Sequence, residues 1–469
     1  MQRRHFLNLL VGSAIASHVG WPAISHAQTT SAKQTTTGPM TWRNWSGSQS
    51  ANPSHRLAPR SQNELLDILS DRAHQEAKIR PVGSGHSFSP LVPTNDVLVS
   101  LARLTGILDH DDHLCRARIA TGTLLGQLGQ PLEAINQALF NMPDIDQQSL
   151  GGMLATATHG TGAELMSLSG YIEGLTLVTA QGDVLECNRN QNPEIFQAAR
   201  VGLGSLGFVT DVTLQNRRPY RLKKTTEWLP LEDILENADT RASEHRNYEF
   251  FYIPFSGMGF TSTHDITDEP ESETEAIDQN DGARDLQQAR DYLSWSPRLR
   301  RLILGGYMRT LSTEVKVASS WQNYTSARNV RFNEMEYHLP RENWQAALRE
   351  VIGVIEGQFP EVFFPIEVRF VKADDAWLSP FYQRDSVSIA VHRFFEEDHT
   401  PLFEAVEPIF RRYGGRPHWG KLNTLTGTDF QTLYPQWQAF SEVREALDPN
   451  GRFLNPYLAR LFTKKTITG

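Results

Sequence analysis

The sequence predicts an α+β fold in two sizeable domains. Strand-length apolar segments at 97–110, 116–123 and 175–188 are mixed with helical patterns, without the regular alternation of strand and helix that a doubly wound sheet requires. The 469 residues exceed the size of one ordinary domain. Three glycine-rich segments all lie in the first half of the chain, which indicates that this half approaches a ligand with its backbone.

The elements follow in order along the chain. Ser61 and Glu64 have capping-box spacing, and leucines on one face follow them, so residues 61–78 (SQNELLDILSDRAHQEAK) predict a helix. The next residues, KIRPVG, predict a short strand that runs into a glycine-rich loop, and residues 123–140 have a helical pattern. After about residue 220 the pattern changes to longer strands and amphipathic helices. The acidic stretch 268–285 predicts a solvated surface loop, with partner binding as the weaker alternative.

The N-terminus predicts export. Paired Arg3 and Arg4 precede an apolar run that ends in the small-x-small pattern Ser25-His26-Ala27, so residues 1–27 are interpreted as a twin-arginine signal peptide rather than a plain helix. Residues 28–40 are polar and predict a disordered linker. Twin-arginine export carries folded proteins, so the signal predicts a periplasmic or otherwise exported protein with a tightly held cofactor. No other segment approaches the ~20 apolar residues of a membrane span.

Composition excludes several other classes. The net charge of −9 argues against a nucleic-acid partner and fits poorly with binding to anionic lipid. Cys115 and Cys187 are the two cysteines, and no CxxC or HExxH spacing accompanies them, so no metal site is expected. The two thiols are either free and buried or paired in an oxidising compartment, the first being preferred.

The loop PVGSGHSFSP, residues 81–90, carries the strongest chemical signal. Residues 83–88 fail the dinucleotide fingerprint GxGxxG at Phe88, but their glycines still form a backbone nest suited to pyrophosphate. From the residues alone, His86 is a metal ligand, a general base, a structural residue or a point of covalent attachment. The segments 149–162 and 200–214 are also rich in small residues, and three such segments are hard to explain as tight turns alone.

Several motifs carry a family resemblance. WRNWSGSQS, KIRPVGSGHS, LGGMLATATHGTG, GDVLECN, EVRF and GGRPHWGK resemble vanillyl-alcohol-oxidase-type FAD flavoproteins, in particular the sugar-1,4-lactone (L-gulonolactone and D-arabinonolactone) oxidases or dehydrogenases and the alditol oxidases. The resemblance spans about residues 40–462. It implies a PCMH-type FAD-binding domain at 41–218 and an α+β substrate domain at 219–469, resembling D-arabinono-1,4-lactone oxidase, whose C-terminal segment returns to the flavin.

The resemblance also implies cofactor contacts. His86 matches the histidine that is bonded to the 8α-methyl of FAD. The glycine-rich loops before residue 165 hold no cysteine for a second bond, so one attachment is expected. The residues that match FAD contacts are Pro81, Val82, Gly83, Ser84, Gly85, His86, Ser87, Gly152, Ala157, Thr158, His159, Gly160, Gly207 and Val209.

Substrate and catalytic residues are expected in the second half. Glu367 and Arg369 are two apart, so on a strand they point to one face. Alone they indicate a surface ion pair, whereas the resemblance implies binding of lactone or polyol hydroxyls. His392 is a candidate general base, with a structural histidine as the alternative. Lys421 of HWGK matches a lysine that balances charge on the flavin, and Ser149 matches a substrate-contacting serine.

The implied function is FAD-dependent oxidation of a CH–OH group of a sugar-1,4-lactone, with electrons passing to O2 or another acceptor. Alditol oxidation is the alternative within the fold, but Phe394 stands where alditol oxidases have a substrate-binding threonine, which favours a lactone. Two functions of other classes also fit a flavin-binding chain: a non-catalytic exported flavin-binding protein and a MurB-like NADPH reductase, of which the reductase would lack HWGK. The choice between oxidase and dehydrogenase depends on small residues around 144–149, and the oligomeric state is open.

Overall fold

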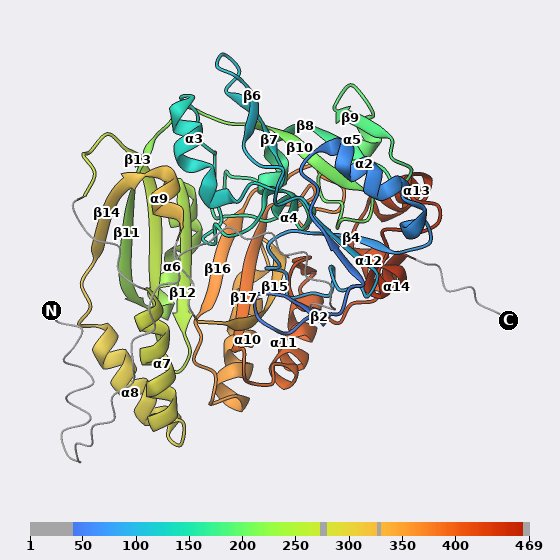
Figure 1. The fold of residues 1–469 in the computed structure, drawn as a ribbon. Helices are drawn as coiled ribbons and strands as arrows, with labels where there is room; N and C mark the ends of the chain where they lie inside the picture. Colours follow the sequence, from blue (N-terminus) through green and yellow to red (C-terminus); the bar gives the residue numbers. More distant parts are fainter. Residues whose placement is uncertain (1–40, 273–278, 326–329, 463–469) are drawn as a thin grey trace, which may run out of the picture. The chain divides into compact units, whose positions relative to one another are not determined.

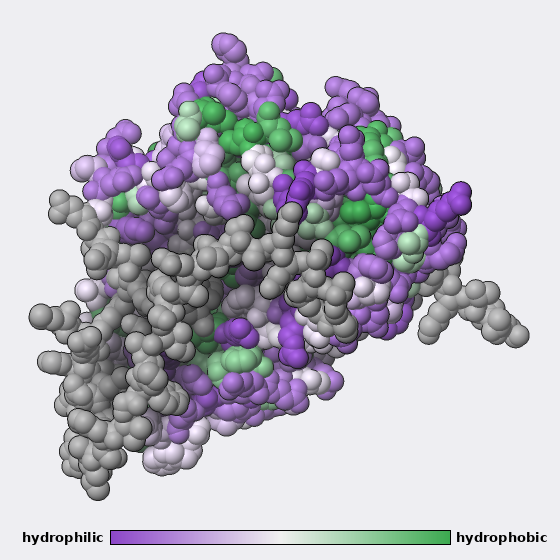
Figure 2. Space-filling model, viewed as in Figure 1, coloured by the Kyte–Doolittle hydropathy of each residue, from purple (hydrophilic) through white to green (hydrophobic). Residues whose placement is uncertain are grey.

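The computed structural model describes residues 41–272, 279–325 and 330–462. The predicted signal peptide and linker lie outside these residues. The described chain builds its strands into two small sheets, a five-stranded sheet and an eight-stranded sheet (Figure 1). None of the described helices is both long enough and apolar enough to cross a membrane. The face drawn in Figure 2 is mainly hydrophilic, with hydrophobic side chains in small separate areas.

The first part of the chain holds the smaller sheets. A parallel sheet has the order β3-β5-β4, a ribbon pairs β1 with β2, and an antiparallel sheet has the order β6-β7-β10-β8-β9. The bounds are β1 Trp42–Arg43, β2 Ser50–Ala51, β3 His55–Leu57, β4 Ile79–Val82, β5 Val97–Ser100, β6 Ile107–Asp111, β7 Arg116–Ala120, β8 Ile172–Val178, β9 Val184–Asn188 and β10 Phe208–Gln215. The helices of this part are α2 Gln62–Ser70, α3 Gly129–Ala134, α4 Leu150–Ala155 and α5 Pro193–Ala199.

The second part is built on one large antiparallel sheet, in the order β14-β11-β13-β12-β16-β17-β15-β18. Its strands are β11 Arg221–Pro230, β12 Asn247–Ile253, β13 Met258–Thr267, β14 Glu314–Ser319, β15 Phe332–Pro340, β16 Ile366–Val371, β17 Ser386–Phe394 and β18 Arg416–Pro417. The helices are α6 Leu231–Glu244, α7 Gln279–Leu293, α8 Pro297–Met308, α9 Ser320–Tyr324, α10 Trp344–Gln358, α11 Thr400–Arg412, α12 Gly427–Leu433, α13 Trp437–Leu447 and α14 Pro456–Phe462.

The central strands of the large sheet have two chemically different faces. On β16, Ile366, Val368 and Phe370 join a hydrophobic core that also contains side chains of α6, α10 and α11. The alternate residues, Glu367 and Arg369, therefore point to the opposite face. The same alternation on β12, β15 and β17 adds polar residues to that face, namely Asn247, Glu249, Glu334, Glu336, His338, Ser388 and His392. One face of the sheet thus packs into a hydrophobic core, and the other face carries polar and charged side chains that are largely buried.

The structure corrects three expectations from the sequence. Helix α2 ends at Ser70 and a short 3-10 turn follows, so the helix is about half as long as the pattern 61–78 suggested. Residues 123–140 form a 3-10 turn and the short α3 instead of one helix, because Gly126, Gly129 and Pro131 interrupt the pattern. Residues 279–285, expected in a surface loop, begin α7.

Residues 453–455 are hydrogen-bonded to β4 and to the first glycine-rich loop. The Arg80 side chain, buried on β4, donates hydrogen bonds to the carbonyl oxygens of Leu91, Gly204 and Phe453. The Asn455 amide donates to the carbonyl oxygens of Pro90, Leu91 and Pro93, at 2.9, 3.2 and 3.0 Å. The strand that carries the loop is therefore locked to residues near the C-terminus. Both cysteines are free thiols, Cys187 buried and Cys115 half-buried.

Candidate active site

The glycine-rich loops and the charged face of the large sheet enclose one cavity of about 280 Å³. Most of the predicted cofactor residues line it, namely Pro81, Val82, Gly83, Ser84, Gly85, His86, Ser87, Gly152, Thr158, His159, Gly207 and Val209. Ser149, Arg369 and Lys421 also line it. Four predicted residues are not among the described residues that line the cavity: Ala157, Gly160, Glu367 and His392.

Backbone forms the wall on the glycine-rich side. Gly207 has a φ of +149°, and a Cβ there would lie 2.3 Å from the Val178 carbonyl oxygen. A Cβ on Gly83 would lie 2.3 Å from Ser149 Oγ, so the first loop rests directly on the start of α4. Side chains at these positions would push the loops apart. The close packing leaves a cavity bounded by peptide groups, which suits a flat ligand with phosphates.

The surroundings of His86 keep its imidazole uncharged. Its ring stacks on Trp45, with ring centroids 5.7 Å apart. Burial, followed by the charge of Lys421, lowers the pKa of His86 to about 4, although Asp146 opposes the shift. Within the described part of the chain no hydrogen bond to the His86 ring is found. At neutral pH the imidazole is therefore uncharged, with a free lone pair at the cavity wall.

Arg369 is the centre of the charged side. It lies opposite Glu249 in the strand register, and its Nε donates to Glu249 Oε2 at 3.2 Å. Its Nη2 donates to Glu367 and lies 3.1 Å from Asp144 Oδ1. Although burial disfavours the charge, these carboxylates hold the pKa of Arg369 well above its usual value. The guanidinium is therefore a fixed cation at the cavity wall.

Lys421 is held by two glutamates of β15. Its Nζ donates to Glu334 and lies 3.9 Å from Glu336 Oε2. Burial disfavours the lysine charge, but the two carboxylates raise the pKa of Lys421 above its usual value. Burial also opposes the charge of Glu334, yet Lys421 and His392 lower the pKa of that carboxyl to about 2. The ammonium and both carboxylates are thus charged together.

His392 lies beside this group and outside the cavity wall. Its Nδ1 is 3.0 Å from the Pro365 carbonyl oxygen, and its Nε2 is 3.6 Å from Glu334 Oε1. The ring packs edge-on against Phe332, with centroids 4.9 Å apart. The structure therefore joins His392 to Lys421 through Glu334.

The sequence did not single out Glu249, Glu334 or Glu336, and Asp144 entered only as the first residue of the segment 144–149. Glu334 and Glu336 sit in NEMEYHLP with the same two-residue spacing as Glu367 and Arg369, so this alternation was a usable signal. Glu249 and Asp144 lie in segments without a motif, and only the fold brings them to Arg369.

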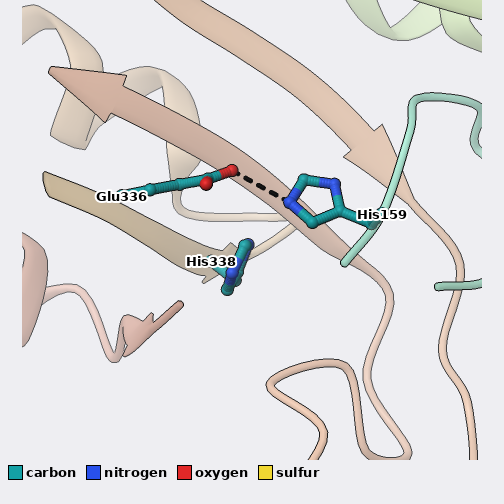
Figure 3. Close-up of side chains that lie close together, drawn as sticks. All are labelled: His159, Glu336 and His338. Carbon is teal, nitrogen blue, oxygen red and sulfur yellow. Dashed lines mark hydrogen bonds and ion pairs between the residues drawn. The ribbon is translucent and has the colours of Figure 1, made fainter. Parts of the chain in front are cut away.

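Two groups of these side chains have the composition of metal ligands. The donor atoms of His159, Glu336 and His338 lie within 4.8 Å of one another, and so do those of Glu334, Glu367 and His392. In each group, however, a glutamate already accepts a hydrogen bond from a cationic or imidazole side chain. The geometry shows these side chains bonded to one another, as His159 is to Glu336 (Figure 3), and to Lys421.

The residues present fit the predicted flavin. The cavity is bounded by peptide groups on the glycine-rich side, which suits the phosphates of a dinucleotide. His86 offers an uncharged imidazole nitrogen, and Lys421 and Arg369 offer positive charge. The peptide-lined wall and the two cations suit the phosphates and the redox ring of FAD.

Comparisons with known proteins agree with the site. Residues 212–461 match the D-arabinono-1,4-lactone oxidase family, and residues 53–188 match a FAD binding domain. The chain is 37% identical to an L-gulono-1,4-lactone dehydrogenase of Mycobacterium tuberculosis over 90% of its length and 98% of the relative. It is 32% identical to the L-gulonolactone oxidase of Mus musculus, with the same coverage.

Among solved structures, the fold is similar to a solvent-stable cholesterol oxidase. The TM-score is 0.76 at 19% identity, and the match covers 90% of this chain and 97% of that one. A cholesterol oxidase from Brevibacterium sterolicum gives a TM-score of 0.74 at 17% identity, covering 90% and 97%. These likenesses concern the fold, which is the predicted two-domain α+β fold of FAD-binding oxidoreductases. The family match over more than half of the chain decides the assignment, and the protein belongs to the sugar-1,4-lactone oxidase and dehydrogenase family, whose members here carry a FAD binding domain.

Proposed function

We propose that this protein uses FAD to oxidise a CH–OH group of a sugar-1,4-lactone. One observation carries the proposal: His86 and the glycine-rich loops share a cavity wall with Arg369 and Lys421. A flavin-binding protein without catalysis would need the loops but would have no use for two buried, carboxylate-held cations beside them. The lactone is favoured over an alditol by the family match and by Phe394 in place of a threonine.

Residues of the charged face bind and orient the substrate. FAD, when bound, supplies the acceptor for the hydride from the hydroxyl-bearing carbon. Arg369 has five N–H groups, and it contacts three carboxylates. In this proposal one of the remaining N–H groups donates a hydrogen bond to a substrate oxygen. Ser149, on the opposite loop, adds a hydroxyl. Lys421 keeps its positive charge at the cavity wall and stabilises negative charge that develops there.

The hydroxyl proton leaves toward the cluster of Glu334, Glu367 and His392. Their donor atoms lie within 4.8 Å of one another, so a proton received at one reaches the others over a short path. His392 is the candidate base in this proposal, and because it lies outside the cavity wall the proton has to reach it through Glu334 or Glu367.

Anaerobic mixing tests this activity. The purified flavoprotein should lose its absorbance near 450 nm when aldonolactones are added, and should respond weakly to open-chain sugar alcohols. Bleaching by sugar alcohols alone would favour the alditol alternative, and no bleaching by either class would contradict catalysis on these donors. Repeating turnover with O2 and then with a dye or cytochrome c separates oxidase from dehydrogenase.

Covalent attachment of FAD at His86 is part of the proposal. The uncharged imidazole at the cavity wall supports a bond from a ring nitrogen to the 8α carbon of the flavin. In the wild-type protein, acid precipitation should leave the flavin in the pellet. His86→Ala should release it to the supernatant, whereas His110→Ala, on the exposed β6–β7 hairpin, should not. Flavin that stays in the His86→Ala pellet would place the attachment elsewhere.

We also propose export by the twin-arginine route, supported by the N-terminal sequence alone. Replacing Arg3 and Arg4 by lysine should retain the flavoprotein in the cytoplasm of its host. Export of the double-lysine variant at the normal level would contradict this route.

A further inference from the structure

The contacts of Arg369 divide its N–H groups into those already directed at a partner and those left over. An arginine side chain carries one hydrogen on Nε and two on each Nη nitrogen, and all five can only donate. Nε donates to Glu249 Oε2 at 3.2 Å. Nη2 donates to Glu367 and lies 3.1 Å from Asp144 Oδ1. Both hydrogens of Nη1 remain, since no acceptor for Nη1 is found within the residues that the structure describes.

Glu249 reaches the guanidinium from the neighbouring strand. It is the direct register partner of Arg369, and their strands β12 and β16 are the two middle strands of the eight-stranded sheet. The Glu249 side chain is 11% exposed and is not among the described residues that line the cavity, whereas Arg369 lines it. On either side of Glu249, Tyr248 and Phe250 pack into the hydrophobic core on the opposite face of the sheet. The core therefore fixes the place of the Glu249 carboxyl.

The other neighbours of the guanidinium do not fix its orientation. Glu367 and Asp144 both contact Nη2, so by themselves they would let the group turn about that nitrogen. Ser388 is the register partner on β17, but its hydroxyl lies 2.6 Å from Nδ1 of His338. Because a guanidinium is planar and rigid, holding a second nitrogen fixes the third. Glu249, which alone holds Nε among these contacts, thus determines where Nη1 points.

We propose that Glu249 is a positioning residue that turns the guanidinium of Arg369 so that the two remaining hydrogens of Nη1 point into the cavity, toward the substrate oxygen. The identity of the substrate rests on the proposed function, whereas the orientation of the guanidinium rests on the contacts above. For this role the acceptor oxygen beside Nε matters more than the charge of the side chain that carries it.

Two substitutions separate the acceptor from the charge. Glu249→Gln keeps an acceptor oxygen at the same side-chain length and removes the acid. Glu249→Asp keeps the acid but is one methylene group shorter, which withdraws its oxygens from Nε. Positioning therefore predicts that Glu249→Asp is the more damaging change, and a purely electrostatic role predicts the reverse order.

Rapid-mixing reduction of the holoenzyme by an aldonolactone measures this order. Glu249→Asp should lower the limiting rate of flavin reduction roughly 10- to 100-fold, because a donor displaced by about 1 Å loses much of its effect. Glu249→Gln should lower it less, and the flavin content of both variants should equal that of the wild type. Glu227→Asp is the matched control, because Glu227 of β11 pairs with Arg241 at 2.7 Å outside the cavity, and it should reduce at the wild-type rate. A wild-type rate in Glu249→Asp, or a slower Glu249→Gln, overturns the inference.

A double variant asks whether Glu249 acts through Arg369. In the Arg369→Ala background, Glu249→Asp should cause no further loss of rate, because the group that it positions is already gone. A further loss by the same factor as in the wild-type background would give Glu249 a separate role and would overturn the inference.

Crystal structures of the wild-type holoenzyme and of Glu249→Asp provide a readout that needs no substrate. Nη1 should face the cavity in the wild type and should turn away in the variant, and an unmoved guanidinium overturns the inference. If Glu249→Asp does not fold, Glu249→Gln and the wild-type structure decide, since Nη1 bonded to another protein group would also overturn it. A failure of lactones to reduce the wild-type flavin would contradict the proposed function, and the two structures would still test the orientation of Arg369.

Discussion

The two walls of the cavity are made in different ways. The first wall is backbone: Gly83, Gly152 and Gly207 bring peptide groups close together, and side chains there would obstruct it. The second wall is side chain: Arg369, Glu336 and Lys421 stand on or beside strands whose other face is a hydrophobic core. The first wall therefore depends on residues that have no side chain. The second wall depends on buried charged side chains that are paired with opposite charges. Because the walls differ in this way, a substitution can disturb one of them and leave the other intact.

The largest effect is expected at the second wall, from Arg369→Ala. Loss of a buried donor to the reacting oxygen should lower the rate of flavin reduction by lactone about 100- to 1000-fold. The flavin content should be unchanged, because the first wall is intact. Rapid-mixing reduction measured at 450 nm checks the rate. Arg349→Ala, which breaks an exposed ion pair with Glu232, should reduce at the wild-type rate, and an equal loss in both variants would remove Arg369 from the site.

A smaller effect is expected at the first wall, from Gly207→Ala. Its positive φ and the 2.3 Å approach of the new Cβ to the Val178 carbonyl oxygen should destabilise the protein by roughly 1–3 kcal/mol. The fraction of protein that retains flavin should fall with it. Gly353→Ala is the matched control, because it lies in α10 with open space around the new Cβ and should stabilise by about 0.5–1 kcal/mol. Thermal melting measures the change in stability of each variant. Shifts of the melting temperature in the same direction would contradict the expectation that the room for the new Cβ decides the effect.

The smallest effect is the loss of stability that we expect at low pH, and it also arises at the second wall. The pKa of Glu334 is lowered in the folded protein to about 2, against an ordinary value of 4.5, so this carboxylate contributes stability that is fully present above pH 4.5. The contribution is lost as the pH falls from 4.5 toward 2, because the unfolded chain takes up the proton first. Glu334→Gln should flatten the fall in melting temperature over that interval. A steeper fall in the variant would show that Glu334 is not ionised in the folded protein.

The sequence predicts the first wall better than the second. Residues 81–87 are recognisable through the family resemblance, since the glycines alone indicate only a backbone nest, and all seven line the cavity. Glu367 and Arg369 follow from strand periodicity. Glu249 and Asp144 do not, because their contacts with Arg369 come from strand register and loop placement, which local patterns do not encode. His392 matched a motif, yet it reaches the cavity only through Glu334.

The hydrogen bonds of Arg80 and Asn455 connect the first glycine-rich loop to residues that are synthesised almost last. Arg80 donates to the carbonyl oxygen of Phe453, and Asn455 donates to the carbonyl oxygens at the end of the first loop. A chain that ends before residue 453 lacks these contacts, so we expect it to hold the first loop less firmly and to retain less cofactor than the complete chain.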